Sequence, residues 1–480
     1  MATRPDRPSA GGLPPWLVVG SLVEALLIAV FFLVPFSQLW TQLPAAPAPS
    51  DVNATPSGDW SAPFAVAVMF GLPSLIPFAL LARLAWDRRT HVSMSRGMTL
   101  ATVALILLPA AVSLATYPCC TGDVLDYVNR QRLWVAYAGN PFVVLPADHP
   151  EDWSYALAHA DSIIAYGPVW WLLTRAFVQW ATTLDEYLLG LKLLAAVCFG
   201  IAAVLIWRLA DRRTRLLSLA FFAWNPALLV EGLLRLHNDL LTVPFLLGAV
   251  WLHQRGRASS SLVTAALGAL VKVSVAPVGL VIAVGLLKSR RWRALAIGLV
   301  GSAMVVSALY APFWFGPGTL ATLFVLGSHT QWSVGSLLVF AIGPWLGSAA
   351  PSAVHWLLIL ACTVLTVALL LKLPASASLV GASMALLLVW VLCLPMAFYS
   401  HYLMPAVALA AIAVDGRLRA LLLAIGFGAM VNSVLGVDEF AGGLSGRALD
   451  VVGSCALILG LAAGLVAMAR STRAQPARAG

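Results

Sequence analysis

Two acids in the stretch TGDVLDYVNRQR, residues 121–132, have the type and surroundings of a general base. Asp123 and Asp126 lie close to Arg130 along the chain. A carboxylate that is partly sheltered from water beside an arginine can accept a proton from a hydroxyl, and such catalysis contributes about 10²–10⁴-fold to a rate. The structural alternative is a helix start, in which Thr121 is the cap and the helix dipole favours the negative charge of Asp123.

A second polar stretch, HNDLL over residues 237–241, opens an apolar segment. His237 and Asp239 can hold a substrate hydroxyl, a phosphate through the imidazolium, or a divalent ion. Two ligands alone do not make a metal site. The structural alternative is that Asn238 or Asp239 is the N-cap of the following helix.

Two cations near these acids are candidates for binding a phosphate. Lys272 lies among apolar residues in GALVKVSVAPV, and a lysine inside a membrane segment needs an anion or a carbonyl partner. Arg235 can grip two phosphate oxygens with its planar guanidinium group. Structural pairing of Lys272 with an acid is the alternative.

Two aromatic turns can border the same cavity. YGPVWW begins at Tyr166, and aromatic faces of this kind stack on sugar rings. FYSHYLMP contains His401 between two apolar segments. Such residues also occur commonly as membrane-interface residues, which is the alternative for both turns.

The elements that position these residues are expected to be membrane helices. The chain of 480 residues is 61% hydrophobic and 10% charged, with a mean hydropathy of +0.90, whereas soluble domains are about 25% charged. The net charge of +9 comes from scattered short clusters, so it does not argue for a nucleic-acid partner, and none is expected. The six cysteines show neither metal-site spacing nor a disulfide framework. The composition therefore predicts an all-α polytopic protein.

Runs of about 20 apolar residues can each cross a bilayer. Residues 16–37 exceed the core of a signal peptide, so we expect a retained helix there, with cleavage as the alternative. The segment 261–287 is expected to fold back near Lys272 and Pro277, and 334–347 to lie at the interface. About fourteen spans result, and the other apolar segments are near 62–82, 98–117, 166–184, 187–207, 216–234, 239–253, 294–313, 353–371, 379–398, 402–414, 420–436 and 451–469.

Basic clusters between the segments predict the orientation, because short cytoplasmic loops collect Lys and Arg. One arrangement places 22 of the 29 basic residues in the cytoplasm, with both termini inside the cell. The loop 118–165 is then external and acidic, with a net charge of −4. The seven basic residues outside the rule either share one external cavity or are separate surface charges: Arg130, Arg132, Arg175, Lys192, Arg235, Lys272 and Arg447.

In their order along the chain, these stretches resemble the GT-C superfamily of integral-membrane glycosyltransferases. The similarity is to bacterial polyprenyl-phosphate-mannose-dependent mannosyltransferases and covers residues 98–315. The residues that carry it are Asp123 with Tyr127, Gly139-Asn140-Pro141-Phe142, Tyr166-Gly167-Pro168, Trp224-Asn225-Pro226, His237-Asn238-Asp239 and Lys272.

The resemblance implies an inverting transfer of a hexose, expected to be mannose, from a polyprenyl-phosphate sugar donor to a glycan or glycolipid acceptor. The family's first-loop aspartate is its catalytic base, which by position is Asp123, with Asp126 ranked second. The family's second acidic pair is represented by Asp239 only, so a divalent metal stays open and no other cofactor is expected. The expected substrate-binding residues are Tyr127, Arg130, Asn140, Tyr166, Arg235, His237, Asn238, Asp239, Lys272 and His401.

The resemblance also divides the chain. Residues 1–97 are expected to be an N-terminal two-helix addition, 98–315 the GT-C catalytic module with its outer loop over 118–185, and 316–480 the C-terminal transmembrane helices. A horizontal helix in the family's first outer loop corresponds to 166–184. The site then faces the outside of the cell membrane, where a lipid-borne donor is needed because nucleotide sugars do not cross the bilayer.

A secondary transporter or flippase for a lipid-linked or polar substrate is the main alternative. Broken helices and intramembrane charges are typical of such proteins. However, the polar residues gather at the outer face, and no paired interrupted segments occur in corresponding halves of the chain. A polymerase or ligase of surface polysaccharide is a further competitor. We therefore expect a membrane-bound transferase.

Overall fold

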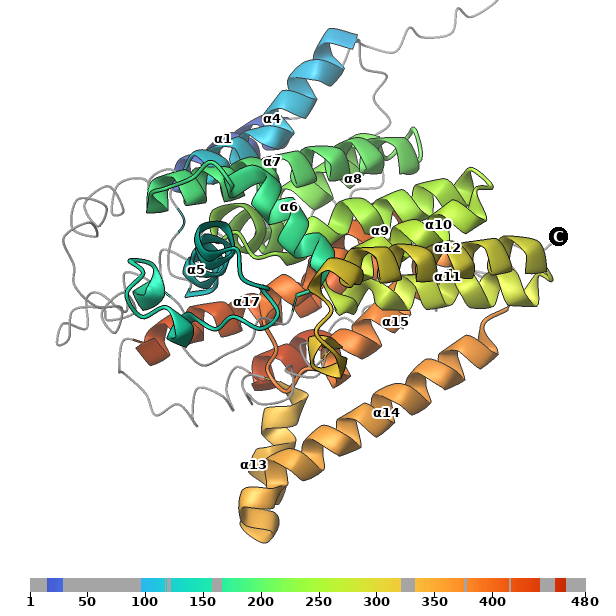
Figure 1. Ribbon diagram of the computed structural model, residues 1–480. Helices are drawn as coiled ribbons and strands as arrows, with labels where there is room; N and C mark the ends of the chain where they lie inside the picture. The colour runs from blue at the N-terminus through green and yellow to red at the C-terminus, as the bar shows by residue number, and fades with distance from the viewer. Residues whose placement is uncertain are drawn as a thin grey trace, which may run out of the picture.

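The structure, a computed structural model, is built of helices and the turns that join them (Figure 1). This confirms the predicted helical class. The predicted segment 62–82, Thr121 and Arg447 lie outside the described residues. Those described are 15–28, 96–116, 118, 122–157, 166–320, 333–374, 378–413, 416–440 and 454–462.

The described helices follow the apolar segments expected from the sequence. The longer ones, in chain order, are α1 (Pro15–Ile28), α4 (Arg96–Ala115), α5 (Gly122–Tyr137), α6 (Pro168–Val178), α7 (Leu184–Leu209), α8 (Arg215–Ala223), η6 (Ala227–Leu234), α9 (Asp239–Gln254), α10 (Ala258–Ala269), α11 (Ala276–Lys288), α12 (Trp292–Tyr310), α13 (Val334–Leu346), α14 (Ala350–Lys372), α15 (Leu379–Cys393), α16 (Met404–Ile412) and α17 (Gly416–Phe440). Short 3₁₀ turns are η4 (Pro146–Asp148), η5 (Tyr155–Leu157), η7 (Val273–Val275), η8 (Ala311–Phe313), η10 (Gly347–Ala349) and η11 (Ser400–Leu403).

Several of these helices are long and apolar enough to cross a membrane. Four stretches of the described residues qualify by length and composition: Arg96–Ala115, Leu184–Leu209, Trp292–Phe313 and Val334–Lys372. The pair α8 and η6, bent by 55° at its break, brings the number to five. The protein is thus a multi-pass membrane protein, while the figure of about fourteen spans stays a prediction.

The predicted break in segment 261–287 is confirmed. Helices α10 and α11 lie side by side (Figure 1) and are joined through η7. Lys272 precedes η7, and Pro277 occupies the first turn of α11, where its missing N–H is tolerated. The break therefore places a lysine at a helix junction instead of in the middle of a span.

The loop over residues 118–185 contributes two helices, α5 and α6, to the assembly. Helix α6 has 11 residues, or about 16 Å, which is too short to span a bilayer. It begins against the break described above, where the Gly167 N–H donates to the Val271 carbonyl at 3.3 Å. A Cβ atom at Gly167 would lie 2.2 Å from the Leu270 carbonyl oxygen, so only glycine fits here.

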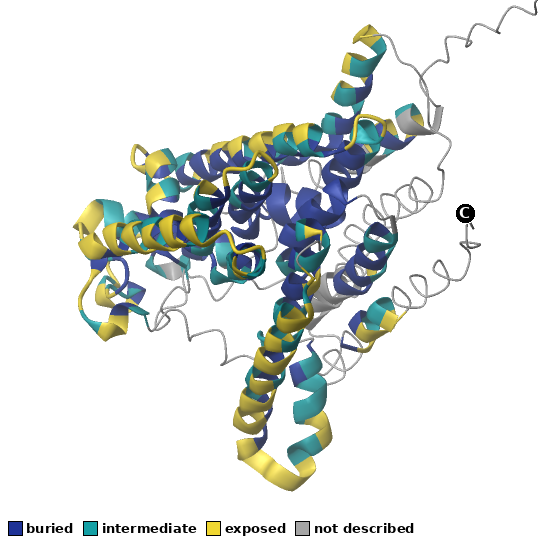
Figure 2. Cartoon of the chain, turned by 90° about the vertical axis from the view of Figure 1, so that its right-hand side faces the viewer, coloured by how far each residue is buried: buried dark blue, intermediate teal, exposed yellow. Residues whose placement is uncertain are grey.

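The core lies where η6, α9 and α16 meet, and it appears as the dark blue centre of Figure 2. Every residue of η6 and of α16 is buried. The π-helical η6 ends at Arg235, whose N–H donates to the Val230 carbonyl at 2.8 Å. Lys192 of α7 donates to the Leu233 carbonyl at 2.7 Å and so satisfies an acceptor that the end of η6 leaves open.

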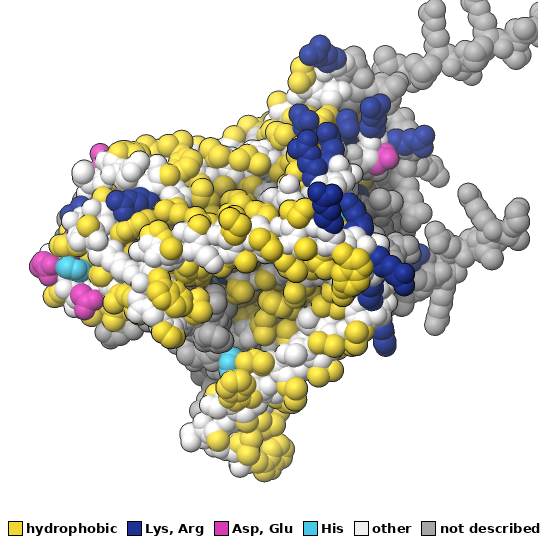
Figure 3. Space-filling view, turned by 45° about the vertical axis from the view of Figure 1, so that its right-hand side comes forward, with side chains coloured by type: hydrophobic (Ala, Val, Ile, Leu, Met, Phe, Trp, Pro, Cys, Tyr) yellow, Lys and Arg dark blue, Asp and Glu magenta, His cyan; other side chains and the backbone are white. Residues whose placement is uncertain are grey.

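Charge is segregated between the two ends of the helix bundle. In Figure 3 most Lys and Arg side chains in view gather at one end, and most Asp and Glu side chains in view lie at the other. The exposed residues of this basic end come from three helix turns and are Arg212, Arg213, Arg255, Arg257, Arg290, Arg291 and Arg293. The assignment of the basic end to the cytoplasm stays a prediction.

Candidate active site

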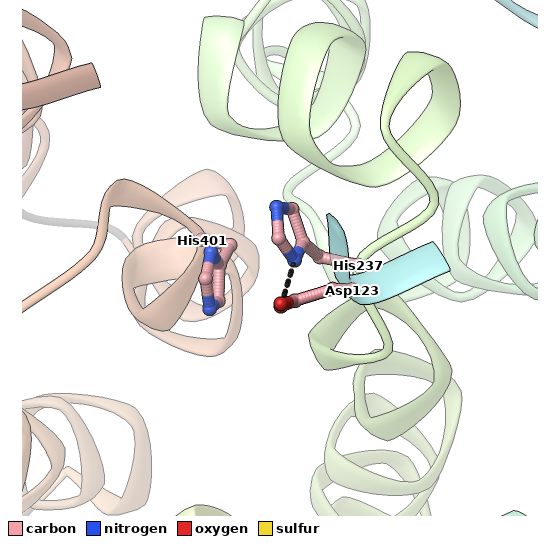
Figure 4. A group of neighbouring side chains, drawn as sticks. All are labelled: Asp123, His237 and His401. Carbon is pink, nitrogen blue, oxygen red and sulfur yellow. Dashed lines mark ion pairs between the residues drawn. The ribbon is translucent and has the colours of Figure 1, made fainter. Parts of the chain in front are cut away.

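Four segments far apart in the sequence meet at the end of α9 that is remote from the basic end. They are the start of α5, the turn between η6 and α9, the break before η7, and η11. Figure 4 shows Asp123 from α5 pointing toward His237 of the turn, with His401 of η11 beside the histidine ring. Helix α9 has 16 residues, so the cluster lies about 24 Å from Arg255 at the basic end.

Asp123, His237 and Glu231 form a continuous network of charged groups, called the Asp123 network below. The Asp123 Oδ2 atom lies 3.1 Å from His237 Nδ1, and Glu231 Oε2 lies 3.2 Å from His237 Nε2. The Asp123 side chain is 44% exposed, whereas those of His237 and Glu231 are 7% and 1% exposed. Asp123 is therefore the member of this network that a substrate can reach.

The backbone of the η6–α9 turn directs His237 toward Glu231. Leu236 adopts a left-handed conformation with φ of 62°, which costs a non-glycine residue about 1–3 kcal/mol. The turn allows the His237 N–H to donate to the Glu231 carbonyl at 2.9 Å. Asn238 occupies the N-cap position of α9, as the structural alternative stated, but its side chain makes no capping hydrogen bond.

Carboxylates face both nitrogens of the His237 ring. Burial alone lowers the pKa of His237, but its contacts with Asp123 and Glu231 outweigh this and raise the pKa to about 9. The ring is therefore a cation at neutral pH. His401 stacks on it with a centroid separation of 3.8 Å and an angle of 17° between the rings.

Among the described residues, Asp123, His237 and His401 form the group with donors for a metal ion. One ligand atom from each lies within 4.8 Å of the others, and such a set suits a transition metal. However, the two imidazole rings are stacked nearly parallel, so their lone pairs do not converge on one point. His237 would also have to lose a proton that two carboxylates hold. As arranged, the group favours a proton over a metal ion.

Glu231 is a site residue that the sequence analysis missed. Its Oε1 accepts from Ser400 Oγ at 2.7 Å and from Arg235 Nη1 at 3.2 Å. The signal was present, because an acid inside the apolar run ALLVEGLL is expensive in a membrane segment and marks a functional site by default. Averaging hydropathy over the segment concealed it.

Lys272 and Asp239 form a second buried pair next to the Asp123 network. The Lys272 Nζ atom lies 2.6 Å from Asp239 Oδ2, which is 3.9 Å from His401 Nε2. The same ammonium group lies 4.5 Å from the centre of the Tyr402 ring and 6.0 Å from that of Tyr166. Lys272 therefore pairs with an acid, as the structural alternative required, and still borders the cluster.

Tyrosines from two motifs form one wall of the cluster. The hydroxyls of Tyr127 and Tyr166 are 3.1 Å apart, and both rings pack on Trp170. Behind them, Asp126 pairs with Arg130 at 3.3 Å on the next turn of α5. Both members of that pair are buried, which leaves Asp123 as the accessible acid of this helix.

Asn140 lies near the opposite end of α5 from Asp123, about 20 Å away along the helix axis. Its Nδ2 donates to the Phe313 carbonyl at 2.8 Å, and its Oδ1 accepts from the Phe142 N–H at 3.0 Å. It borders a separate cavity of about 400 Å³ together with Trp134. The structure therefore does not bring Asn140 into the cluster.

The seven basic residues that fall outside the orientation rule do not share one cavity. Arg235 and Lys272 join the cluster, whereas Lys192 binds backbone carbonyls. Arg132 pairs with Asp152 at 3.2 Å, and the Arg175 guanidinium lies 4.3 Å from the centre of the Trp134 ring. The expectation of a common cavity is wrong for these three, since each is neutralised or stacked locally.

Comparison with known proteins identifies a family whose matched region contains most residues of the cluster. No curated protein and no solved structure matches the chain. Residues 21–289 match the family described as alpha-(1->6)-mannopyranosyltransferase, N-terminal domain, which is more than half of the 480 residues. The match contains Asp123, Glu231, His237 and Lys272, and it favours the transferase over the transporter. The chain belongs to the alpha-(1->6)-mannopyranosyltransferase family, a GT-C family of polyprenyl-phosphate-mannose-dependent mannosyltransferases, and is thus a hexosyltransferase.

Proposed function

We propose that the protein transfers mannose from a polyprenyl-phosphate donor to a hydroxyl of a glycan or glycolipid, with inversion, at the outer face of the membrane. The observation that carries the proposal is the combination of one accessible carboxylate, Asp123, with three buried cations, Arg235, His237 and Lys272. A carboxylate at the mouth suits proton removal, and fixed cations behind it suit a phosphate leaving group.

In this mechanism the acceptor oxygen attacks the anomeric carbon as the bond from that carbon to the phosphate oxygen breaks. The hydroxyl proton goes to Asp123, and polyprenyl phosphate leaves with the bonding electron pair. Positioning the hydroxyl against both groups supplies much of the acceleration.

The charges of the cluster match this change. Its three cations are opposed by Asp123, Glu231 and Asp239, so the six groups sum to zero before reaction. When Asp123 takes the proton, one positive charge remains in the cluster. This net positive charge balances the negative charge that the phosphate gains as it leaves. The fixed cations of the cluster supply it, and fixed charges are worth far more in a site that excludes water.

The Asp123→Asn variant tests the proposal in membranes supplied with radiolabelled polyprenyl-phosphate mannose and a mannan acceptor. We expect transfer to fall about 10²–10⁴-fold with unchanged expression. Asp185→Asn, which alters an exposed acid at the start of α7, is the matched control and should stay within about twofold of wild type. Wild-type activity in the Asp123→Asn variant would overturn the role of Asp123.

Donor and acceptor are tested separately by analysing the cell envelope of a deletion strain with mass spectrometry. The expected result is a mannan or mannolipid shortened by α-1,6-linked mannose, together with accumulation of the lipid-linked sugar. An unchanged envelope would contradict the assigned substrates.

A further inference from the structure

Glu231 makes more polar contacts than a structural ion pair needs. It accepts from Ser400 Oγ at 2.7 Å, from Arg235 Nη1 at 3.2 and 3.4 Å, and lies 3.2 Å from His237 Nε2. Its side chain is 1% exposed. A buried charge is costly unless it is paired and its lone pairs are satisfied, and this carboxylate meets both conditions.

We propose that Glu231 is a positioning residue, which holds the charged His237 ring with its Nδ1 atom beside the Asp123 carboxylate. This inference rests on the proposed function, because it assigns Glu231 a part in the reaction through Asp123. Ser400 and Arg235 fix the carboxylate of Glu231, and the carboxylate in turn fixes the ring.

The geometry of the ring carries the proposal. Both nitrogens of a charged imidazole carry a proton, so the ring is held in place by the acceptors that lie beside each of them. Glu231 accepts from Nε2, and Nδ1 is left 3.1 Å from Asp123 Oδ2. Without the carboxylate, Nε2 would face the neighbouring Arg235 guanidinium, so the ring would turn or lose a proton. Asp123 would then lose the positive charge that lies beside it.

Ser400 links the Asp123 network to the second half of the protein. It lies 169 residues after Glu231 and belongs to η11, the turn that also carries His401. His401 stacks on the His237 ring and limits its rotation from the other side. The ring of His237 is therefore held at its edge by Glu231 and at its face by His401.

A double-mutant cycle separates positioning from a general structural effect. Glu231→Gln keeps the shape of the side chain but replaces a charge-assisted hydrogen bond, so we expect kcat to fall about 10–100-fold. In a His237→Asn background the same change should alter kcat by less than about threefold. Equal losses in both backgrounds would show that Glu231 acts without His237 and would overturn the proposal.

The pH profile gives a second readout, which does not need activity in the His237→Asn background. Removing one of the carboxylates that hold the His237 proton should move the alkaline limb of kcat to lower pH by at least about one unit. A structural defect would lower the rate equally at every pH and would overturn the proposal. The charged and titratable groups around His237 from the packed segments are Asp123, Glu231, Arg235, Asp239, Lys272 and His401.

Ser400→Ala covers the case in which Glu231→Gln does not fold. It removes one hydrogen bond to the carboxylate and leaves the charge, so kcat should fall about three- to tenfold, again only when His237 is present. Glu186→Gln, in the cap of α7, is the matched control and should keep wild-type kcat. If Asp123→Asn is inactive but Glu231→Gln and Ser400→Ala are fully active, only this inference fails. If Asp123→Asn is active, the proposed function fails.

Discussion

Lys272 and Asp239 form a buried ion pair across 33 residues of sequence, with Nζ 2.6 Å from Oδ2. The pair joins the break between α10 and α11 to the first turn of α9. It thereby fixes two of the segments that build the active site relative to each other.

Removing one partner of this pair should cost more than removing both. Lys272→Met leaves the carboxylate of Asp239 buried and unpaired, so we expect a loss of about 3–5 kcal/mol in the free energy of unfolding. The double variant Lys272→Met/Asp239→Asn should recover at least half of that loss while remaining inactive. Thermal unfolding of detergent-purified protein measures this, with the exposed Lys372→Met as control. Equal melting temperatures for the single and double variants would contradict the pairing.

Stability should fall at alkaline pH because His237 loses its proton. Its pKa is raised from 6.5 to about 9, so the stabilisation is fully present below about pH 6.5 and is lost as the pH rises through about 9. The difference amounts to about 3 kcal/mol. Melting temperatures of wild type and His237→Gln, measured from pH 6 to pH 10, should converge at the alkaline end. A constant gap over this range would exclude a proton-linked role.

The close approach at Gly167 predicts strong sensitivity to a single methyl group. Gly167→Ala would place a Cβ atom 2.2 Å from the Leu270 carbonyl oxygen and push α6 away from the segment before Lys272. We expect a loss of about 1–3 kcal/mol in stability and a larger loss of activity. Gly200→Ala, where a Cβ atom meets nothing within 4 Å, is the matched control and should be neutral. Wild-type transfer by Gly167→Ala would contradict this close packing.

Labelling of introduced cysteines tests the orientation. Asp185→Cys lies at the start of α7, far from the basic end, and Arg213→Cys lies at the basic end. In intact cells a membrane-impermeant maleimide should modify the first variant and should modify the second only after permeabilisation. The wild-type chain provides the background from its own cysteines. The opposite pattern would place the active site in the cytoplasm.

Local features of the structure could be predicted from the sequence. The positions of α4 and α7 follow from apolar runs long enough to span a bilayer. The break at Lys272 follows from a proline and an ionisable residue within one apolar segment. These features depend on residues close together in the chain, which is why composition and spacing were sufficient.

The partners within the site could not be predicted in the same way. Ser400 reaches Glu231 across 169 residues, and Asp123 meets His237 across the helices α6, α7, α8 and η6. Such contacts depend on how the helices pack and leave no periodic signal in the sequence. Lys192 shows the reverse error, because a buried lysine that looked functional is used by backbone carbonyls.

The π-helical η6 has a consequence for how this site tolerates change. Each of its turns holds about one residue more than an α-helical turn, and Glu231 of this segment pairs with Arg235 directly after it. Deleting any one residue between Ala227 and Val230 would keep the segment equally apolar but would turn Glu231 to another side relative to the helix before the deletion. We therefore expect related proteins to differ in the apolar residues of this segment but to conserve its length.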